Sequence, residues 1–102
     1  MNTKEHLLKM RELLADPKAW TTGEYARNEA NEPCEATSST AKKWCLFGAS
    51  WRAGYELAST HVCNAPTLGF TNQGCVLRWN DDPDRTHAEV LAHLDSLIQN
   101  TK

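Results

Sequence analysis

The segment from Ala41 to Ser59 is apolar on most sides, and it constrains the fold more than any other part of the chain. It contains two tryptophans seven positions apart, Trp44 and Trp51, which would share nearly the same face of a helix. A helix without a wide polar face belongs in the middle of a domain. Gly48 would weaken this helix by about 1 kcal/mol relative to Ala, so we expect another backbone or a large ring to pack closely there.

Two further helices are expected near the ends of the chain. Four leucines recur at helical spacing before Asp16-Pro17, which predicts a helix over residues 3–15, because the residue before proline avoids the helical region. Thr86 and Glu89 have the spacing of a capping box, in which each side chain satisfies a backbone amide of the first turn. An apolar stripe follows them, and the pattern predicts a helix over residues 86–100.

The connectors between these helices read as irregular. Residues 20–40 lack helical periodicity and leave room for a short hairpin, while Gly, Pro and Asn interrupt residues 60–79 too often for a long helix. Cys75 to Trp79 fits either a short strand or one helical turn. At 102 residues the chain has material for one core. We therefore expect a single, mainly α domain over 1–102, with three helices (about 3–15, 41–59 and 86–100) around the central apolar one.

The charge of the chain excludes several classes of partner. Eleven Lys and Arg against 13 Asp and Glu give a net charge of −2, without the basic excess of a protein that binds nucleic acid or anionic lipid. The charge is uneven, because residues 20–40 and residues 80–102 each carry −3. No apolar run approaches the ~20 residues of a membrane span, and the first 15 residues lack the apolar stretch of a signal peptide. We expect a cytoplasmic location and no membrane partner.

The chain has four cysteines, Cys34, Cys45, Cys63 and Cys75, without a C-x-x-C pair. In a reducing compartment such residues are expected to be free thiols, mostly packed as small apolar side chains. His61 and Cys63 are the only closely spaced pair of zinc ligands, and structural zinc sites use tighter sets. We predict no metal site and no cofactor.

Two motifs resemble those of a known family. Trp44 to Ala49 resembles W-C-x-x-G-A, and Trp79 to Leu91 resembles W-N-D-x-P-x-R-T-x-x-E-V-L. Together with a Trp-containing turn like Trp20 to Gly23, they look like a family of small uncharacterised proteins in bacteria, phages and prophages. That family has no assigned activity, so the resemblance implies a shared pattern and a phage or mobile-element association, and no mechanism.

Cys45 is the one candidate nucleophile. It lies near the start of the central helix, where the helix dipole lowers a thiol pKa, and His61 and Asn80 follow it in the chain order of a papain-like site. This arrangement would suit a cysteine-dependent hydrolase or transferase. The apolar bulk beside the thiol, Leu46 and Phe47 among it, favours a packed core residue instead.

Two groups of residues are candidate binding sites. Trp79, Asn80 and Asp81 would either shape the turn into the last helix or, with Trp44, line a pocket for a small ligand. Trp51, Arg52 and Tyr55 have the composition of a protein-interaction hot spot, because the central helix cannot bury every side.

Three functions remain open on the sequence alone. The leading expectation is a non-enzymatic accessory protein of phage or mobile-element type that binds a host or phage protein. Inhibition of a host defence complex is one concrete version of this function. Its size, acidity and phage resemblance suggest that version. The alternatives are the Cys45-dependent enzyme and the small-ligand pocket.

Overall fold

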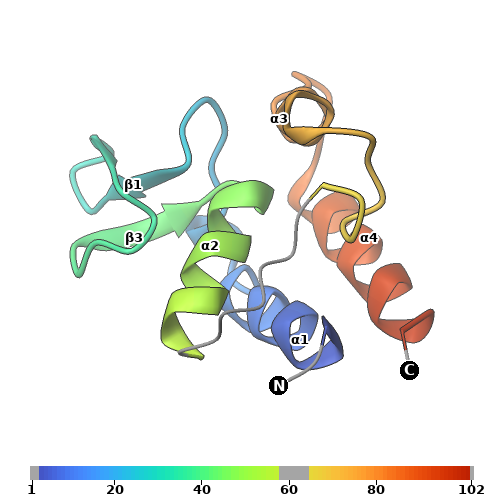
Figure 1. Ribbon diagram of the computed structural model, residues 1–102. Helices are drawn as coiled ribbons and strands as arrows, with labels where there is room; N and C mark the ends of the chain where they lie inside the picture. The colour runs from blue at the N-terminus through green and yellow to red at the C-terminus, as the bar shows by residue number, and fades with distance from the viewer. Residues whose placement is uncertain (1–2, 58–64, 102) are drawn as a thin grey trace.

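The computed structural model describes residues 3–57 and 65–101. Within these residues, helices and an antiparallel sheet are combined in a small mixed domain (Figure 1). The helices are α1 (Thr3–Leu13), a short 3-10 helix η1 (Pro17–Ala19), α2 (Leu46–Glu56), α3 (Gln73–Asn80) and α4 (His87–Gln99). The strands are β1 (Ala26–Asn28), β2 (Pro33–Cys34) and β3 (Ala41–Trp44).

The expectation of a mainly α domain with three helices is wrong, because the sequence conceals a strand and a fourth α-helix. The segment predicted as one helix over 41–59 begins as strand β3, in which Ala41 and Trp44 are buried and Lys42 is exposed. Helix α2 begins only at Leu46, after Cys45 has adopted an extended backbone at the cap position. Residues 58 and 59 lie outside the described part of the chain.

The second correction concerns residues 73–80, which form helix α3. The side chain of Asn72 caps this helix by accepting a hydrogen bond from the backbone amide of Cys75. An Asn cap satisfies one of the amides that the first turn leaves without an intrahelical partner, and this stabilises a helix as short as α3.

The sheet has the strand order β2-β1-β3, with both pairs antiparallel. Ala26 of β1 is paired with Cys34 on one side and with Trp44 on the other. The β1–β2 pair is a short hairpin in the connector over 20–40, where the sequence left room for one. Asn31, in the turn of this hairpin, has a φ of 65°, a conformation that Asn adopts more readily than most residues.

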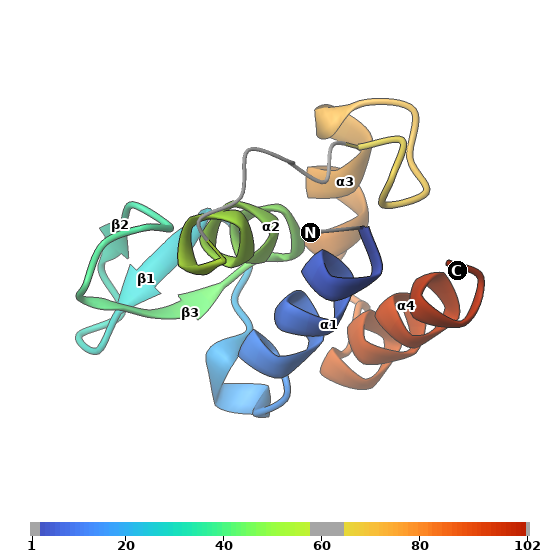
Figure 2. The same cartoon turned by 60° about the horizontal axis from the view of Figure 1, so that its bottom comes forward.

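The expectation that the other helices surround one central apolar helix is wrong for α4, which packs mainly against α1. Helix α1 packs against α2 on one side and α4 on the other, and α3 packs against α2 (Figure 2). The sheet lies at one end of the molecule and α4 at the other. The core joins α1, α2, α3 and α4 through fully buried side chains: Leu7, Met10, Leu14, Leu46, Val76, Val90 and Leu94. In the described part of the chain, no helix is both long enough and apolar enough to span a bilayer.

Two local predictions are confirmed by this fold. A Cβ atom at Gly48 would lie 1.9 Å from the carbonyl oxygen of Tyr25, so the absence of a side chain lets α2 meet the backbone that leads into β1. Thr86 and Glu89 form the expected capping box at the start of α4, with both hydrogen bonds present. Helix α4 is correspondingly one of the two helices whose bounds follow the sequence prediction closely.

Candidate functional site

Asn80 lies at the end of α3, fully buried, and all four of its hydrogen-bonding positions are used. Its side-chain oxygen accepts from the indole Nε1 of Trp20 at 2.7 Å and from the backbone amide of Leu46 at 3.0 Å. Its side-chain nitrogen donates to the carbonyl of Thr21 at 3.1 Å and to the carboxylate of Asp81 at 2.9 Å. We call these five residues the Asn80 junction, because they join the turn after η1, the start of α2 and the end of α3.

Asp81 extends the junction to the turn over residues 20–23. The same carboxylate oxygen that accepts from Asn80 also accepts from the backbone amide of Gly23 at 3.0 Å. Gly23 has a φ of +82°, which glycine adopts without the steric cost of a side chain. The turn and the carboxylate therefore fix each other, and the polar atoms of Asn80 are committed inside the protein.

Trp79 lies beside the junction and is held by a stack of side chains. The guanidinium carbon of Arg85 lies 4.0 Å from the centre of the Trp79 ring, and Arg85 Nε donates to the Trp79 carbonyl at 2.9 Å. Phe70 and His93 contact the same ring system, with ring centres 5.7 Å and 5.0 Å from that of Trp79. The residues of the second motif thus connect α3 to α4.

Cys45 occupies the cap of α2 as a buried acceptor. Its sulfur accepts a hydrogen bond from the amide of Gly48 at 3.2 Å, and the residue is 1% exposed. Burial raises the pKa of the Cys45 thiol to about 11, and this effect outweighs the hydrogen bonds from backbone amides, which lower it. A neutral, enclosed thiol lacks the low pKa and the access that a nucleophile needs.

Of the two predicted partners of Cys45, only Asn80 lies in the described part of the chain. Asn80 is near α2, but its amide is engaged as described above, and His61 lies outside the described residues. Cys34, Cys45 and Cys75 are free thiols. Within residues 3–57 and 65–101, no three His, Cys, Asp or Glu side chains gather as a metal site would require.

The exposed aromatic residues of α2 form the second candidate site. Trp51 is 44% exposed and Tyr55, one turn further along the helix, is 63% exposed. The Tyr25 ring packs against Trp51, with ring centres 5.1 Å apart, and Phe47 supports Trp51 from the preceding turn at 5.6 Å. We call Tyr25, Trp51 and Tyr55 the Trp51 face.

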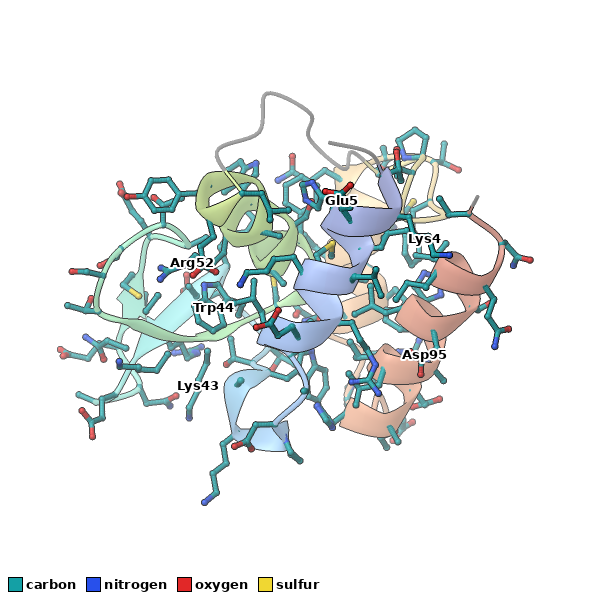
Figure 3. All side chains as sticks on the ribbon, turned by 90° about the horizontal axis from the view of Figure 1, so that it is seen from below. Lys4, Glu5, Lys43, Trp44, Arg52 and Asp95 are labelled. Carbon is teal, nitrogen blue, oxygen red and sulfur yellow. The ribbon has the colours of Figure 1, made fainter. Side chains whose placement is uncertain are left out.

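Arg52, predicted to belong to this surface, points the other way. Its guanidinium donates to the carbonyls of Ala36 and Ser38, at 3.3 Å and 2.7 Å, and lies 5.4 Å from the centre of the Trp44 ring. Figure 3 shows Arg52 and Trp44 next to each other between α2 and the sheet. Arg52 therefore fastens α2 to the chain between β2 and β3, and only Trp51 and Tyr55 of the predicted group remain on the surface.

Two hollows flank Tyr25. One, of about 220 Å³, is lined by Gly23, Glu24, Tyr25, Leu77 and Asp81. The other, of about 280 Å³, is lined by Tyr25, Cys34, Glu35, Ala36, Thr37 and Trp51. Both are smaller than the 300–1,000 Å³ typical of small-molecule sites. A third hollow of about 440 Å³ lies among polar residues between the turns at Ala30 and Thr40, away from the candidate residues.

Tyr25 is the residue of this surface that the sequence analysis missed as a binding residue. Tyr25 lies in the acidic connector over residues 20–40, where the sequence predicts only an aromatic side chain that anchors the connector to the core. The backbone carbonyl of Tyr25 accepts from the Cys45 amide at 3.1 Å, and its hydroxyl accepts from the side-chain amide of Gln73. These contacts hold the Tyr25 ring beside Trp51. The sequence signal that could have identified Tyr25 as a binding residue is a Tyr in an otherwise polar segment.

The comparison with protein families places the chain in one of them. A model described as "Family of unknown function (DUF6197)" matches residues 1–100. The chain belongs to this family. No curated protein and no solved structure gave a significant match. The expected resemblance to an uncharacterised family is therefore confirmed, and the function has to be argued from the geometry.

Proposed function

We propose that this member of the DUF6197 family is a non-enzymatic binding protein that docks a protein partner through the Trp51 face. The observation that carries the proposal is the exposure of Trp51 and Tyr55 on adjacent turns of α2, whose other apolar residues are buried. Leu8 is the other large apolar side chain exposed in the described part of the chain, and it lies on α1. Trp and Tyr are enriched among the residues that dominate protein interfaces.

The side chains packed against Trp51 also favour a docking role for this face. Tyr25 and Phe47 hold the Trp51 ring from two sides, so a partner would not have to order it on binding. The hollow of about 280 Å³ beside Trp51 gives a partner side chain a place to enter. A face of this kind, with a fixed aromatic centre, suits a protein surface better than a small molecule.

A phage or mobile-element accessory role is the wider form of the proposal, with inhibition of a host defence complex as its most concrete version. It rests on the small size and acidity of the chain and on the resemblance of its motifs to proteins of phages and prophages. The partner is then a host or phage protein that meets the Trp51 face.

The test is affinity capture from native host cells with three forms of the protein: wild type, Trp51→Ala and Leu8→Ala. Leu8 is 47% exposed, close to the 44% of Trp51, so its variant removes a comparable apolar surface elsewhere. We expect wild type and Leu8→Ala to retain the same partner and Trp51→Ala to lose it. Equal recovery of all proteins by the three forms would rule out the Trp51 face as the docking site.

A further inference from the structure

The carboxylates around the Trp51 face indicate the chemistry of the partner, an inference that rests on the proposed function. Each hollow beside Tyr25 carries an acidic lining: Glu24 and Asp81 in one, Glu35 in the other. Glu24, Glu35 and Asp81 are all exposed, whereas no Lys or Arg of the described residues lines either hollow. Both hollows that Tyr25 lines therefore present negative charge.

Two arginines close to the Trp51 face in the fold, Arg27 and Arg52, are engaged inside the protein. The guanidinium of Arg27 donates to the side chain of Thr21 and to the carbonyls of Thr22 and Asn31, at 3.1 to 3.2 Å. Arg52 donates to the carbonyls of Ala36 and Ser38 and pairs with Glu56. Neither arginine reaches over the hollows to pair with Glu24 or Glu35.

Aromatic rings and carboxylates together suit a basic side chain. An Arg or Lys head group is attracted to the faces of Trp and Tyr rings, and its charge is matched by a carboxylate at the rim. The aliphatic stem of such a side chain also packs well on apolar walls, which Leu77 provides in one hollow and Trp51 in the other.

We propose that the protein partner presents two basic side chains, Lys or Arg, from one segment, and that they enter the hollows on either side of Tyr25. The Trp51 ring supplies the apolar centre of the interface. Glu24, Asp81 and Glu35 supply the charge that selects a basic segment and speeds its approach at low ionic strength.

The test begins with a library of random dodecapeptides displayed on yeast and sorted against the full chain. We expect the recovered peptides to be enriched in Arg and Lys and to bind wild type and Leu8→Ala but not Trp51→Ala. Peptides that depend on Trp51 without enrichment of basic residues would overturn the basic-segment inference and leave the docking face standing. Failure to recover any peptide that depends on Trp51 would overturn both.

One recovered peptide then tests the hollows themselves by fluorescence anisotropy. The double variant Glu24→Lys/Glu35→Lys should weaken its binding at least tenfold, because each hollow then repels a basic side chain. The double variant Glu29→Lys/Glu32→Lys makes the same charge change on two exposed residues of the same segment outside both hollows, and it should stay within twofold of wild type. Equal weakening by this control variant would show a general charge effect and contradict the assignment.

Discussion

The Asn80 junction and the Trp51 face start from similar sequence, a tryptophan next to polar residues, and the structure uses them in opposite ways. In the junction, every hydrogen-bonding position of Asn80 is occupied by the protein itself, and the residue is fully buried. On the Trp51 face, two aromatic side chains remain on the surface with acidic hollows beside them. A polar motif with complete internal partners holds a fold, whereas an aromatic group that the fold leaves exposed is available for binding.

The largest expected effect comes from removing the centre of the junction. Asn80→Ala leaves the indole NH of Trp20 and the buried amide of Leu46 without their acceptor. At about 2 kcal/mol for each orphaned donor, the free energy of unfolding should fall by about 4 kcal/mol. Urea unfolding followed by circular dichroism measures this loss. A decrease below about 1 kcal/mol would show that water replaces Asn80 and that the junction does not hold the fold.

The contact between α2 and the chain before β1 is nearly as sensitive. In Gly48→Ala the new methyl group meets the Tyr25 carbonyl oxygen at 1.9 Å, so α2 or that backbone has to move. We expect a loss of about 3 kcal/mol, although the Gly to Ala change alone favours a helix by about 1 kcal/mol. The same urea experiment shows whether Gly48→Ala lowers or raises the free energy of unfolding. A stabilised variant would mean that α2 and Tyr25 are further apart than described.

The Cys45 cap should make stability fall in alkali. Its thiol has a folded pKa of about 11 against a reference value of 9.0, so below pH 9 it is neutral in both states and costs nothing. Above pH 9 the unfolded chain loses the proton while the folded protein keeps it, and the free energy of unfolding decreases. The decrease due to this group should reach about 2 kcal/mol at pH 10.5.

The difference between wild type and Cys45→Ser isolates this contribution, because serine keeps an acceptor at the cap and does not titrate in this range. The other cysteines, the tyrosines and the lysines are common to both proteins. We expect the free energy of unfolding of wild type to fall, relative to that of Cys45→Ser, by about 2 kcal/mol between pH 8 and pH 10.5. Parallel stability profiles would mean that the Cys45 thiol is accessible to water and leave room for a reactive cysteine.

The smallest effect on stability is expected at the Trp51 face. Trp51→Ala removes ring contacts with Tyr25 and Phe47 and should cost about 1 kcal/mol. The thermal midpoint, compared with that of Leu8→Ala, measures it. A loss as large as that of the junction variant would assign Trp51 to the core and remove the basis for a docking face.

The helices at the two ends of the chain could be predicted from sequence because their signals are local. Leucine spacing and Asp16-Pro17 defined α1, and the capping box of Thr86 and Glu89 defined α4. Strand β3 could not be separated from α2, because Trp44, Cys45 and Leu46 form one apolar run. The change from strand to helix depends on the pairing of β3 with β1 and on the Cys45 cap, and only the folded chain supplies the pairing.

The candidate sites also differ in how far the sequence could predict them. The exposure of Trp51 could be expected, because a helix that carries so many large side chains cannot bury them all. The role of Asn80 could not, because its partner Trp20 is 60 positions away in the chain. The W-N-D sequence predicted a turn or a pocket, and the contacts that bury Asn80, with Trp20, Thr21 and Leu46, are long-range. Tyr25 was missed as a binding residue for a similar reason, since only the fold brings it to Trp51.

The most direct test of the division between junction and face is the difference in unfolding free energy between Asn80→Ala and Trp51→Ala, measured in urea under identical conditions. We expect Asn80→Ala to be less stable than Trp51→Ala by at least about 2 kcal/mol. Equal losses in the two variants, or a larger loss for Trp51→Ala, would contradict it, because Trp51 would then hold the fold as much as Asn80 does.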